Sequence, residues 1–235
     1  MKVVSDRLFG GIRMPKVTPE YIEQKKQMIV DAAYNVCLRK PVDTVTISDV
    51  IAETGMSMGA IYRYYSGLDE ILADMLRKVR TDYGAYDRIT RLVNETDVSF
   101  EELIYRVYDA MADVMEEHLM DIQKINFDFG VMAINSPDRM KRILSEVEGQ
   151  GNLEKICADL VPKMVEGAES LGYQMKCSQE ELLLYLSSST TGIEKLCILS
   201  SCYGTGVPGI EVGPRQLFRT LAKSVILLLG GNVNE

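Results

Sequence analysis

The sequence predicts an all-α protein, and two observations carry that prediction. Glycine and proline divide the 235 residues into helix-sized segments, and almost no segment shows the period-two alternation of a half-buried strand. Apolar residues make up 46% of the chain and charged residues 26%, which is the profile of a soluble globular protein with a sizeable core. The longest apolar runs, such as 224–230, are far shorter than the roughly 18 to 20 residues that a membrane span needs. Because the N-terminus also lacks a secretory leader, we expect a cytoplasmic protein without membrane contact.

Start and stop signals locate the first two helices. Pro19 is a favoured residue in a first helical turn, and Pro41 cannot continue a helix, so a helix is expected over about 20–39. The hydroxyl of Thr46 can cap a second helix of little more than two turns, which ends at Gly55, a usual residue just after a helix C-terminus.

A tight turn then leads into two further helices. Ser57 can cap a third helix over 58–65, and a fourth is expected to begin near Leu68 and to continue through Val79. The second and third helices are short and are joined by a turn of a few residues, which is the pattern of a helix-turn-helix.

The remainder of the chain is also expected to be helical. The expected helices span about 100–118, 121–134, 137–149, 152–171, 178–202 and 214–229. We therefore divide the chain into a flexible arm, a helix-turn-helix domain and a larger helical domain for ligand binding and dimerisation, over residues 1–17, 18–67 and 68–235.

Four groups of residues give the helix-turn-helix a more specific character. They are Ile29 with Ala32 and Ala33, the segment Thr46–Ala52 (TISDVIA), the segment Gly55–Tyr65 (GMSMGAIYRYY) and the segment Asp69–Leu72 (DEIL). Together these residues resemble the DNA-binding domain of the TetR family of bacterial transcriptional regulators, with the resemblance strongest over 25–72. The resemblance implies that the third helix enters the major groove of DNA.

The outward residues of the third helix suit that groove. Arg63 can reach a guanine edge or a phosphate, Tyr62 and Tyr64 can donate to phosphate oxygens, and the small residues Gly59 and Ala60 permit contact with a thymine methyl group. The resemblance implies contacts by several of these positions and by the start of the second helix on the DNA backbone. The candidate DNA-binding residues are Thr46, Ser57, Met58, Gly59, Ala60, Tyr62, Arg63 and Tyr64.

The sequence departs from the family where phosphate contacts are common. Members often carry lysine at the positions of Met58, Ser66 and Leu68, which are uncharged here. Fewer phosphate contacts predict DNA binding that is weaker or less sensitive to salt.

Charge is distributed unevenly along the chain. The net charge of −8 divides into +2 over residues 1–14, zero over 15–80 and −10 over 81–235. The acidic second part argues against nonspecific polyanion binding there, whereas the N-terminal segment could contact DNA as an arm or remain a free tail. Its basic residues are Lys2, Arg7, Arg13 and Lys16.

The last two helices carry apolar stripes wider than a surface helix needs. The resemblance implies that they pair with a second copy of the chain, and a two-fold operator would also favour a homodimer. The candidate interface residues are Leu186, Thr190, Ile193, Leu217, Leu221, Val225 and Leu228.

Methionine is frequent, with 13 residues, and flexible thioether side chains suit a cavity for an apolar ligand. Ordinary core packing explains the same residues equally well. The candidate ligand-binding residues are Met111, Met115, Phe127, Met132 and Met164.

The sequence therefore predicts a ligand-responsive repressor. It would bind a palindromic operator in double-stranded DNA as a homodimer, and a small, largely apolar effector would release it. The alternative is a helical small-molecule-binding or scaffold protein whose helix-turn-helix has lost its affinity for DNA.

An enzyme is disfavoured, and no cofactor or metal is expected. The segment Gly55–Gly59 matches the nucleophile elbow of α/β hydrolases, but that elbow needs a preceding strand and a late histidine. The only histidine is His118, and with Glu116, Glu117 and Asp121 it forms only a weak metal pattern, more typical of a solvated helix end. The five cysteines are widely spaced and are expected to be buried, reduced thiols.

Overall fold

The computed structural model describes residues 18–81, 85–94, 97–147, 152–205 and 213–233, and no strand occurs among them. The prediction of an all-α protein is therefore confirmed, and none of the described helices is long and apolar enough to cross a membrane. In chain order the elements are α1 (Pro19–Arg39), the 3-10 turn η1 (Val42–Thr44), α2 (Ile47–Thr54), α3 (Met58–Ile61), α4 (Leu68–Thr81), α5 (Ala85–Val93), α6 (Phe100–His118), the π-helical turn η2 (Leu119–Gln123), α7 (Lys124–Asn135), α8 (Pro137–Ser145), α9 (Asn152–Ser170), α10 (Gln179–Ser201) and α11 (Pro214–Leu228).

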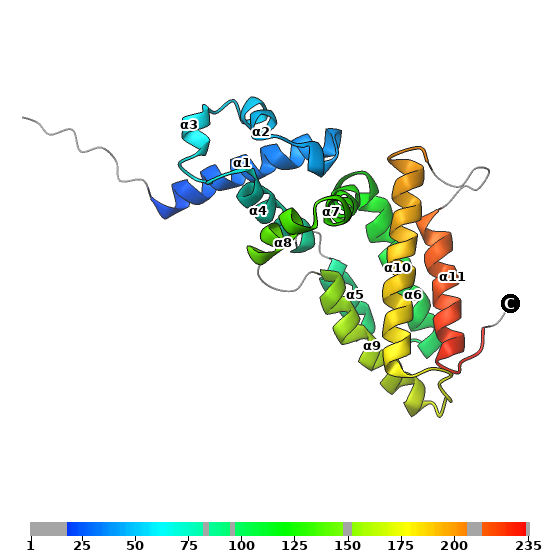
Figure 1. The fold of residues 1–235 in the computed structure, drawn as a ribbon. Helices are drawn as coiled ribbons and strands as arrows, with labels where there is room; N and C mark the ends of the chain where they lie inside the picture. Colours follow the sequence, from blue (N-terminus) through cyan, green and yellow to red (C-terminus); the bar gives the residue numbers. More distant parts are fainter. Residues whose placement is uncertain (1–17, 82–84, 95–96, 148–151, 206–212, 234–235) are drawn as a thin grey trace, which may run out of the picture.

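The elements form an elongated molecule with two ends (Figure 1). Helices α1 to α3 lie at one end, α5, α6 and α9 to α11 form a bundle at the other, and α4, α7 and α8 lie between them. This arrangement separates the helix-turn-helix from the bundle by a layer of three helices.

Two apolar cores correspond to this arrangement. The N-terminal core comprises the buried side chains of α1 to α4 together with those of α7 and α8, and the C-terminal core comprises those of α5, α6 and α9 to α11. Ile125, Phe129 and Met132 of α7 belong to the same core as Ile29 of α1 and Ile61 of α3. The helix-turn-helix and α7 therefore share one core, in which α7 contacts α1, η1 and α4.

A buried ion pair strengthens the contact between α7 and α1. Lys124 Nζ lies 2.8 Å from Asp128 Oδ2, and it donates to the carbonyl oxygen of Cys37 at 2.7 Å. Tyr203, in the turn after α10, donates to the other oxygen of Asp128. The carbonyls of a last helical turn have no partner inside the helix, so the ammonium group of Lys124 satisfies one at the end of α1. This polar network joins α1, α7 and the end of α10.

Helices α6 and α11 pack against each other along the bundle. The rings of Tyr108 and Phe218 lie 6.4 Å apart in the C-terminal core, and on the outer side Arg219 forms a two-pronged ion pair with Asp109 at 2.8 and 2.9 Å. Arg215 adds an ion pair with Asp113 at 2.5 Å. These contacts fix the position of α11.

Most of the expected dimer-interface residues of α10 and α11 lie inside the bundle of their own chain. The most apolar stripe of each helix faces the C-terminal core of its own chain, because a bundle of this size needs those side chains for its own packing. Leu217 and Leu228 are half-buried against that core. The other five expected interface residues are at most 9% exposed and cannot reach a partner: Leu186, Thr190, Ile193, Leu221 and Val225.

Three elements differ from the sequence-based expectations. Helix α5 was not expected, because it is short, strongly polar and contributes only Ile89 to the fully buried core. The third helix ends at Ile61 instead of Tyr65. The helices expected as 100–118 and 121–134 are continuous through η2, where the side chain of Asp121 accepts from the N–H of Ile122 at 2.5 Å.

Candidate nucleic-acid interface and ligand cavities

Helix α2 begins with a capping box. The hydroxyl of Thr46 accepts from the N–H of Asp49 at 3.3 Å, and the Asp49 carboxylate accepts from the N–H of Thr46 at 2.8 Å. Lys40 also donates to that carboxylate at 2.7 Å, and these hydrogen bonds from Lys40 and Thr46 lower the pKa of Asp49 to about 2. The cap is therefore ionised at neutral pH, and it fixes the exposed Thr46 at the start of α2.

The turn between α2 and α3 has the expected chemistry. Gly55 has a φ of +66° and its N–H donates to the Ile51 carbonyl at 3.1 Å, which ends α2 in a left-handed residue. Ser57 then accepts from the N–H of Ala60 at 3.3 Å and starts α3. These local hydrogen bonds end α2 at Gly55 and start α3 after Ser57.

We call residues 58–65 the α3 segment, because they comprise α3 and the turn that follows it. The inward side chains of this segment are anchored in the N-terminal core. Ile61 is fully buried and Tyr65 is 2% exposed. The hydroxyl of Tyr65 donates to Asp74 of α4 at 2.8 Å, and Lys26 of α1 lies 5.0 Å from the centre of its ring. Both side chains therefore face the core.

The front of the α3 segment has no partner within the described part of the chain. Met58 is 54% exposed and Tyr62 is 49% exposed, and Arg63 is also exposed. No described residue contacts the hydroxyl of Tyr62 or the guanidinium of Arg63 through a hydrogen bond or an ion pair. Six of the eight expected DNA-binding residues are exposed at this end of the molecule: Thr46, Ser57, Met58, Gly59, Tyr62 and Arg63.

The other two expected residues are less accessible. Ala60 is half-buried, and Tyr64 is half-buried because it packs against the N-terminal core. Gly59 has a different environment, since no atom lies within 4 Å of the position that a Cβ there would occupy. The absence of a side chain at Gly59 is therefore not required by packing against another helix of this chain. The basic N-terminal arm lies outside the described residues.

The bundle contains two adjoining cavities. The outer cavity, of about 490 Å³, lies between α5 and α9 and is lined by polar residues such as Tyr86, Thr90 and Asp159 together with apolar ones. The inner cavity, of about 90 Å³, lies among α5, α6 and α9 and is lined mostly by apolar side chains. Three residues line both cavities: Val93, Leu160 and Lys163.

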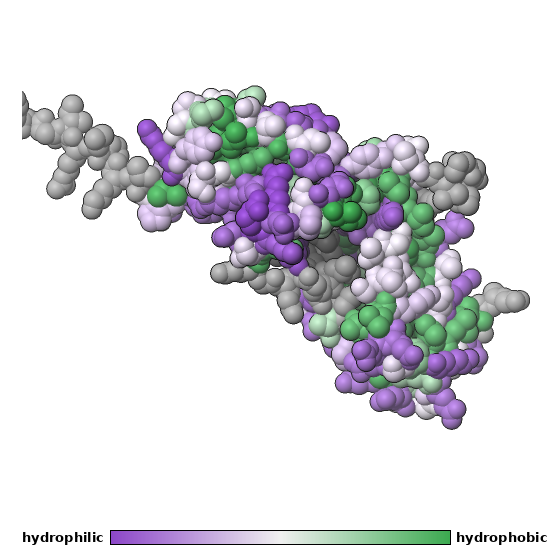
Figure 2. Space-filling view, in the orientation of Figure 1, coloured by the Kyte–Doolittle hydropathy of each residue, from purple (hydrophilic) through white to green (hydrophobic). Residues whose placement is uncertain are grey.

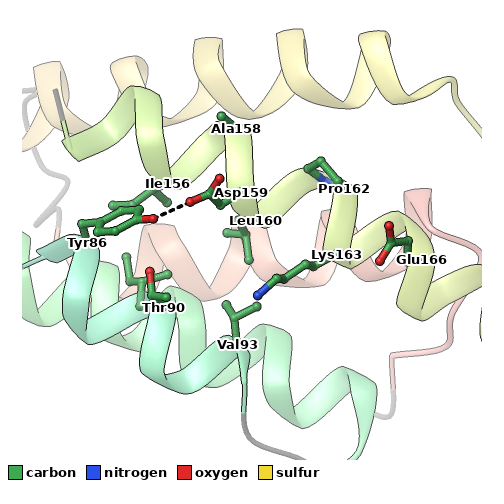
Figure 3. A pocket seen from close by; sticks show the side chains of 11 residues that line it. Tyr86, Thr90, Val93, Ile156, Ala158, Asp159, Leu160, Pro162, Lys163 and Glu166 are labelled. Atoms are coloured by element: carbon green, nitrogen blue, oxygen red, sulfur yellow. Dashed lines mark hydrogen bonds between the residues drawn. The ribbon is translucent and has the colours of Figure 1, made fainter. Parts of the chain in front are cut away.

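Figure 3 shows how the outer cavity is built. Tyr86 of α5 donates to Asp159 of α9 at 2.5 Å across one end, and the Lys163 side chain extends from α9 toward Val93 of α5. Pro162 lies within α9 and has no N–H, so the carbonyl four residues earlier lacks its usual helical donor beside the cavity.

The structure does not bring the expected ligand-binding residues together. Met164 lines the inner cavity, whereas Met111 and Met115 belong to the packing of the C-terminal core. Met132 is buried in the N-terminal core, and the ring of Phe127 lies 6.1 Å from that of Tyr203. These four residues do not line either of the two cavities described, and the apolar, flexible side chains of the three methionines are accounted for by core packing.

Sequence reasoning also missed most of the residues that line the cavities. Tyr86, Thr90 and Val93 are on α5, which was not expected, and Lys163 and Asp159 are polar residues on the outer side of α9. The one usable signal was Pro162, because a proline in the interior of an expected helix marks a local irregularity.

The geometry offers no hydrolase site. Ser57 follows helix α2 and a turn, not a strand, and its hydroxyl oxygen caps α3. The only histidine, His118, lies at the end of α6, where its Nδ1 is 3.4 Å from Asp121.

Two carboxylates of the weak metal pattern, Glu116 and Glu117, form ion pairs with different arginines. Glu116 pairs with Arg215 at 2.9 Å, and Glu117 pairs with Arg88 at 3.1 Å. No group of three or more metal-ligating side chains occurs among the described residues. Four cysteine thiols are described and all are free, with burial raising the pKa of Cys37 to about 12 and that of Cys197 to about 11. The side chain of Cys157 lies outside the described residues.

The fold and the site are those of a helix-turn-helix protein with a helical bundle that contains cavities. Comparison with known proteins agrees. Residues 29–75 match the family model for bacterial regulatory proteins of the tetR family. The chain is also 26% identical over 129 residues to the uncharacterized HTH-type transcriptional regulator YfiR of Bacillus subtilis (strain 168). That match covers 53% of this chain and 59% of the relative, so the similarity spans little more than half of the relative's length.

Solved structures share the whole fold at low sequence identity. FadR of Bacillus halodurans, a fatty acid degradation regulator, is 16% identical with a TM-score of 0.59, over 90% of this chain and 97% of FadR. A proposed transcriptional regulator of Pseudomonas aeruginosa PAO1 is 17% identical with a TM-score of 0.60, over 92% of this chain and 93% of that protein. The match of the tetR-family model to residues 29–75 confirms the resemblance to the TetR family that the sequence showed over residues 25–72.

Proposed function

We propose that this chain is a transcriptional regulator that binds a palindromic DNA operator as a homodimer and is released from it by a small, largely apolar molecule. The observation that carries the proposal is that the outward side chains of the α3 segment are exposed, while its inward side chains are buried in the N-terminal core. Met58, Tyr62 and Arg63 are held in place by the buried Ile61 and Tyr65, yet they have no partner in the described chain.

The exposed side chains can read and hold DNA. A guanidinium can donate two parallel hydrogen bonds to the O6 and N7 atoms of guanine, and a phenol hydroxyl can donate to a phosphate. The open space at Gly59 allows the α3 backbone to approach a base edge closely. The combination supports sequence-selective contact by α3 and backbone contact by the start of α2.

A single helix-turn-helix reads few base pairs, so high affinity favours two copies on a two-fold site. The outward face of α10 carries Leu183, Leu184 and Tyr185, which are exposed, and α11 carries the exposed Leu227. Apolar patches lie over α10 and α11 among polar surface (Figure 2). We infer that a second copy packs on these outward faces, instead of on the stripes that the chain buries in its own core.

The cavities offer a place for the effector, and the fold offers a route to the DNA-binding end. The inner cavity contacts α6, which continues through the π-helical turn η2 into α7, and α7 shares the N-terminal core with α1 and α3. A ligand acts through this route only if it favours one spacing of the two recognition helices, commonly by about 1 to 3 kcal/mol.

Selection from a random duplex pool by the full-length protein tests the DNA part of the proposal. Sequencing of the retained duplexes is expected to show an enriched inverted repeat. Absence of enrichment from a protein that circular dichroism shows to be folded would contradict DNA reading. It would favour the helical scaffold alternative, which the uncharged Met58 and the acidic second half of the chain also suggest.

A further inference from the structure

We propose that the two cavities bind an amphipathic anion, with a narrow aliphatic chain in the inner cavity and a carboxylate held by Lys163. This inference deepens the proposed function and rests on its assumption that the bundle binds a small molecule. Three observations carry it, namely the apolar, narrow inner cavity, the place of Lys163 and the distribution of charge around the outer cavity.

The inner cavity suits a chain and not a bulky ring system. Its volume of about 90 Å³ is well below the roughly 300 to 1,000 Å³ of a whole ligand pocket, so it accommodates only the narrow end of a ligand. Phe100, Val107, Tyr108 and Met164 are among the side chains that line it. Burial of an aliphatic chain in such surroundings is favourable because it removes apolar surface from water.

Lys163 lies where the two cavities meet. It lines both of them, and its Nζ donates to the neutral amide oxygen of Asn94 at 3.0 Å. No described carboxylate lies within ion-pair distance of this ammonium group. A positive charge beside an apolar cavity, with only a neutral partner, favours an anionic group on the ligand.

Neither carboxylate that lines the outer cavity forms an ion pair with Lys163. Asp159 accepts the hydroxyl of Tyr86 at 2.5 Å, and Glu166 points away from Lys163 (Figure 3). Lys155 contributes a second cation, whose Nζ lies 5.8 Å from the centre of the Tyr86 ring. Two ammonium groups and two carboxylates therefore lie at or near the outer cavity, and Lys163 is the cation that a ligand carboxylate would meet where the two cavities join.

Gly167 keeps the inner cavity open. A Cβ at this position would lie 2.7 Å from Cε2 of Phe100, so any side chain there must displace the ring that lines the cavity. Gly167→Ala is therefore expected to disturb the chain-binding part without changing any charge.

Isothermal titration calorimetry of the full-length protein, without DNA, tests the proposal with three probes of equal chain length: octanoate, octan-1-ol and octylamine. Octanoate is expected to bind at least about tenfold more tightly than octan-1-ol, since a charge-assisted hydrogen bond is lost in the alcohol. Octylamine is expected to bind more weakly than octan-1-ol, because its ammonium group repels Lys163.

Three variants separate the parts of the site. Lys163→Met is expected to remove the preference for octanoate while it retains the binding of octan-1-ol, and Gly167→Ala is expected to weaken both. Lys141→Met is the matched control, because Lys141 is a largely exposed lysine on α8, away from the cavities. Circular dichroism establishes that each variant is folded.

Two results would overturn the proposal: no saturable binding of octanoate, or an affinity for octanoate that Lys163→Met leaves unchanged. Release of a selected duplex is measured in a separate titration. If octanoate binds but does not release DNA, the ligand class stands and the regulatory response fails. If no duplex is ever selected, the DNA part of the proposed function fails while the calorimetry still decides the ligand class.

Discussion

Under the proposed function, Arg63 is the side chain on which base recognition would depend most directly. It is exposed on an anchored segment and has no described partner, so its loss removes no contact within the chain. Arg63→Ala is expected to weaken binding of a selected duplex by about 1 to 3 kcal/mol and to leave the thermal unfolding midpoint unchanged. Fluorescence anisotropy and a thermal melt measure the two effects. A variant that unfolds would show that the assignment of the faces of α3 is wrong.

The uncharged Met58 is one reason why weak or less salt-sensitive DNA binding is expected from the sequence. A substitution at this position tests that expectation. It is an exposed apolar residue at the first position of α3, where family members often carry lysine. Met58→Lys is expected to raise DNA affinity at low salt and to steepen the slope of log K against log salt by about 0.9. An unchanged slope in an anisotropy titration over a range of salt concentrations would mean that residue 58 does not approach a phosphate.

The ionisation of Asp49 makes the stability of the start of α2 depend on pH. Hydrogen bonds from Lys40 and Thr46 lower its pKa to about 2 from an ordinary value of 3.8, so the ionised form stabilises the fold. That stabilisation is fully present above about pH 4 and is lost as the pH falls through about 2. Asp49→Asn is therefore expected to have a lower urea midpoint than wild type at pH 7. The difference between the two midpoints is expected to shrink as the pH falls from 4 to 2. A difference that stays constant over this range would contradict the assignment.

Among the elements, α7 has the most consequential contacts, because the network of Lys124, Asp128 and Tyr203 connects it to the end of α1 and to α10. Lys124 is 7% exposed and Asp128 is 4% exposed. Lys124→Met leaves a buried carboxylate without its cation and is expected to cost about 3 to 5 kcal/mol of unfolding free energy. Urea denaturation measures this loss.

Tyr203→Phe provides the comparison for that variant, since it removes a single hydrogen bond to Asp128 and is expected to cost only about 1 kcal/mol. The double variant Lys124→Met/Asp128→Leu is expected to recover much of the lost stability, because no buried charge remains. Equal losses in Lys124→Met and Tyr203→Phe would show that the ion pair has little weight.

Elements with local signals were predictable from the sequence, and those that depend on distant packing were not. The ends of α1 and α2 follow from Pro19, Thr46 and Gly55, whose effects act within one helical turn. Helix α5 has no cap signal and buries only Ile89 completely, so it depends on its contacts with α6 and α9. The π-helical turn η2 likewise has no residue pattern that distinguishes it from a helix break.

The same distinction applies to the candidate sites. The DNA-binding surface follows from local signals, whereas the cavities depend on distant packing. The exposed front of the α3 segment follows from a short motif, because residues 55–65 form their own turn and caps. The cavities arise between α5, α6 and α9, and their lining combines residues as distant as Val93 and Lys163. A list of methionines could not identify these residues, since it indicates burial and not where packing is incomplete.

For the whole molecule, the outward face of α10 is the proposed dimer interface. Leu184 is 64% exposed there, whereas Leu186 faces the core of its own chain. Leu184→Glu is expected to convert a dimer into a monomer, as measured by light scattering coupled to size exclusion. Leu144→Glu on α8, an exposed leucine outside this face, is the matched control and is expected to leave the mass unchanged. A dimeric Leu184→Glu variant would exclude this face as the interface.

The distribution of charge predicts how the molecule would be oriented on DNA under the proposed function. Residues 81–235 carry a net charge of −10, and residues 15–80, which form α1 to α4, are neutral overall. Repulsion between the bundle and DNA phosphates therefore favours approach by the end that contains α2 and α3 (Figure 1).

Parallel selections from one random duplex pool test whether the front of the α3 segment reads DNA sequence. Wild type, Arg63→Ala and the control Lys141→Ala would be run side by side at moderate salt. We expect wild type and Lys141→Ala to enrich the same inverted repeat, and Arg63→Ala to lose or relax the preference at one position in each half. Enrichment of an identical repeat by Arg63→Ala, at an affinity equal to wild type, would contradict the account.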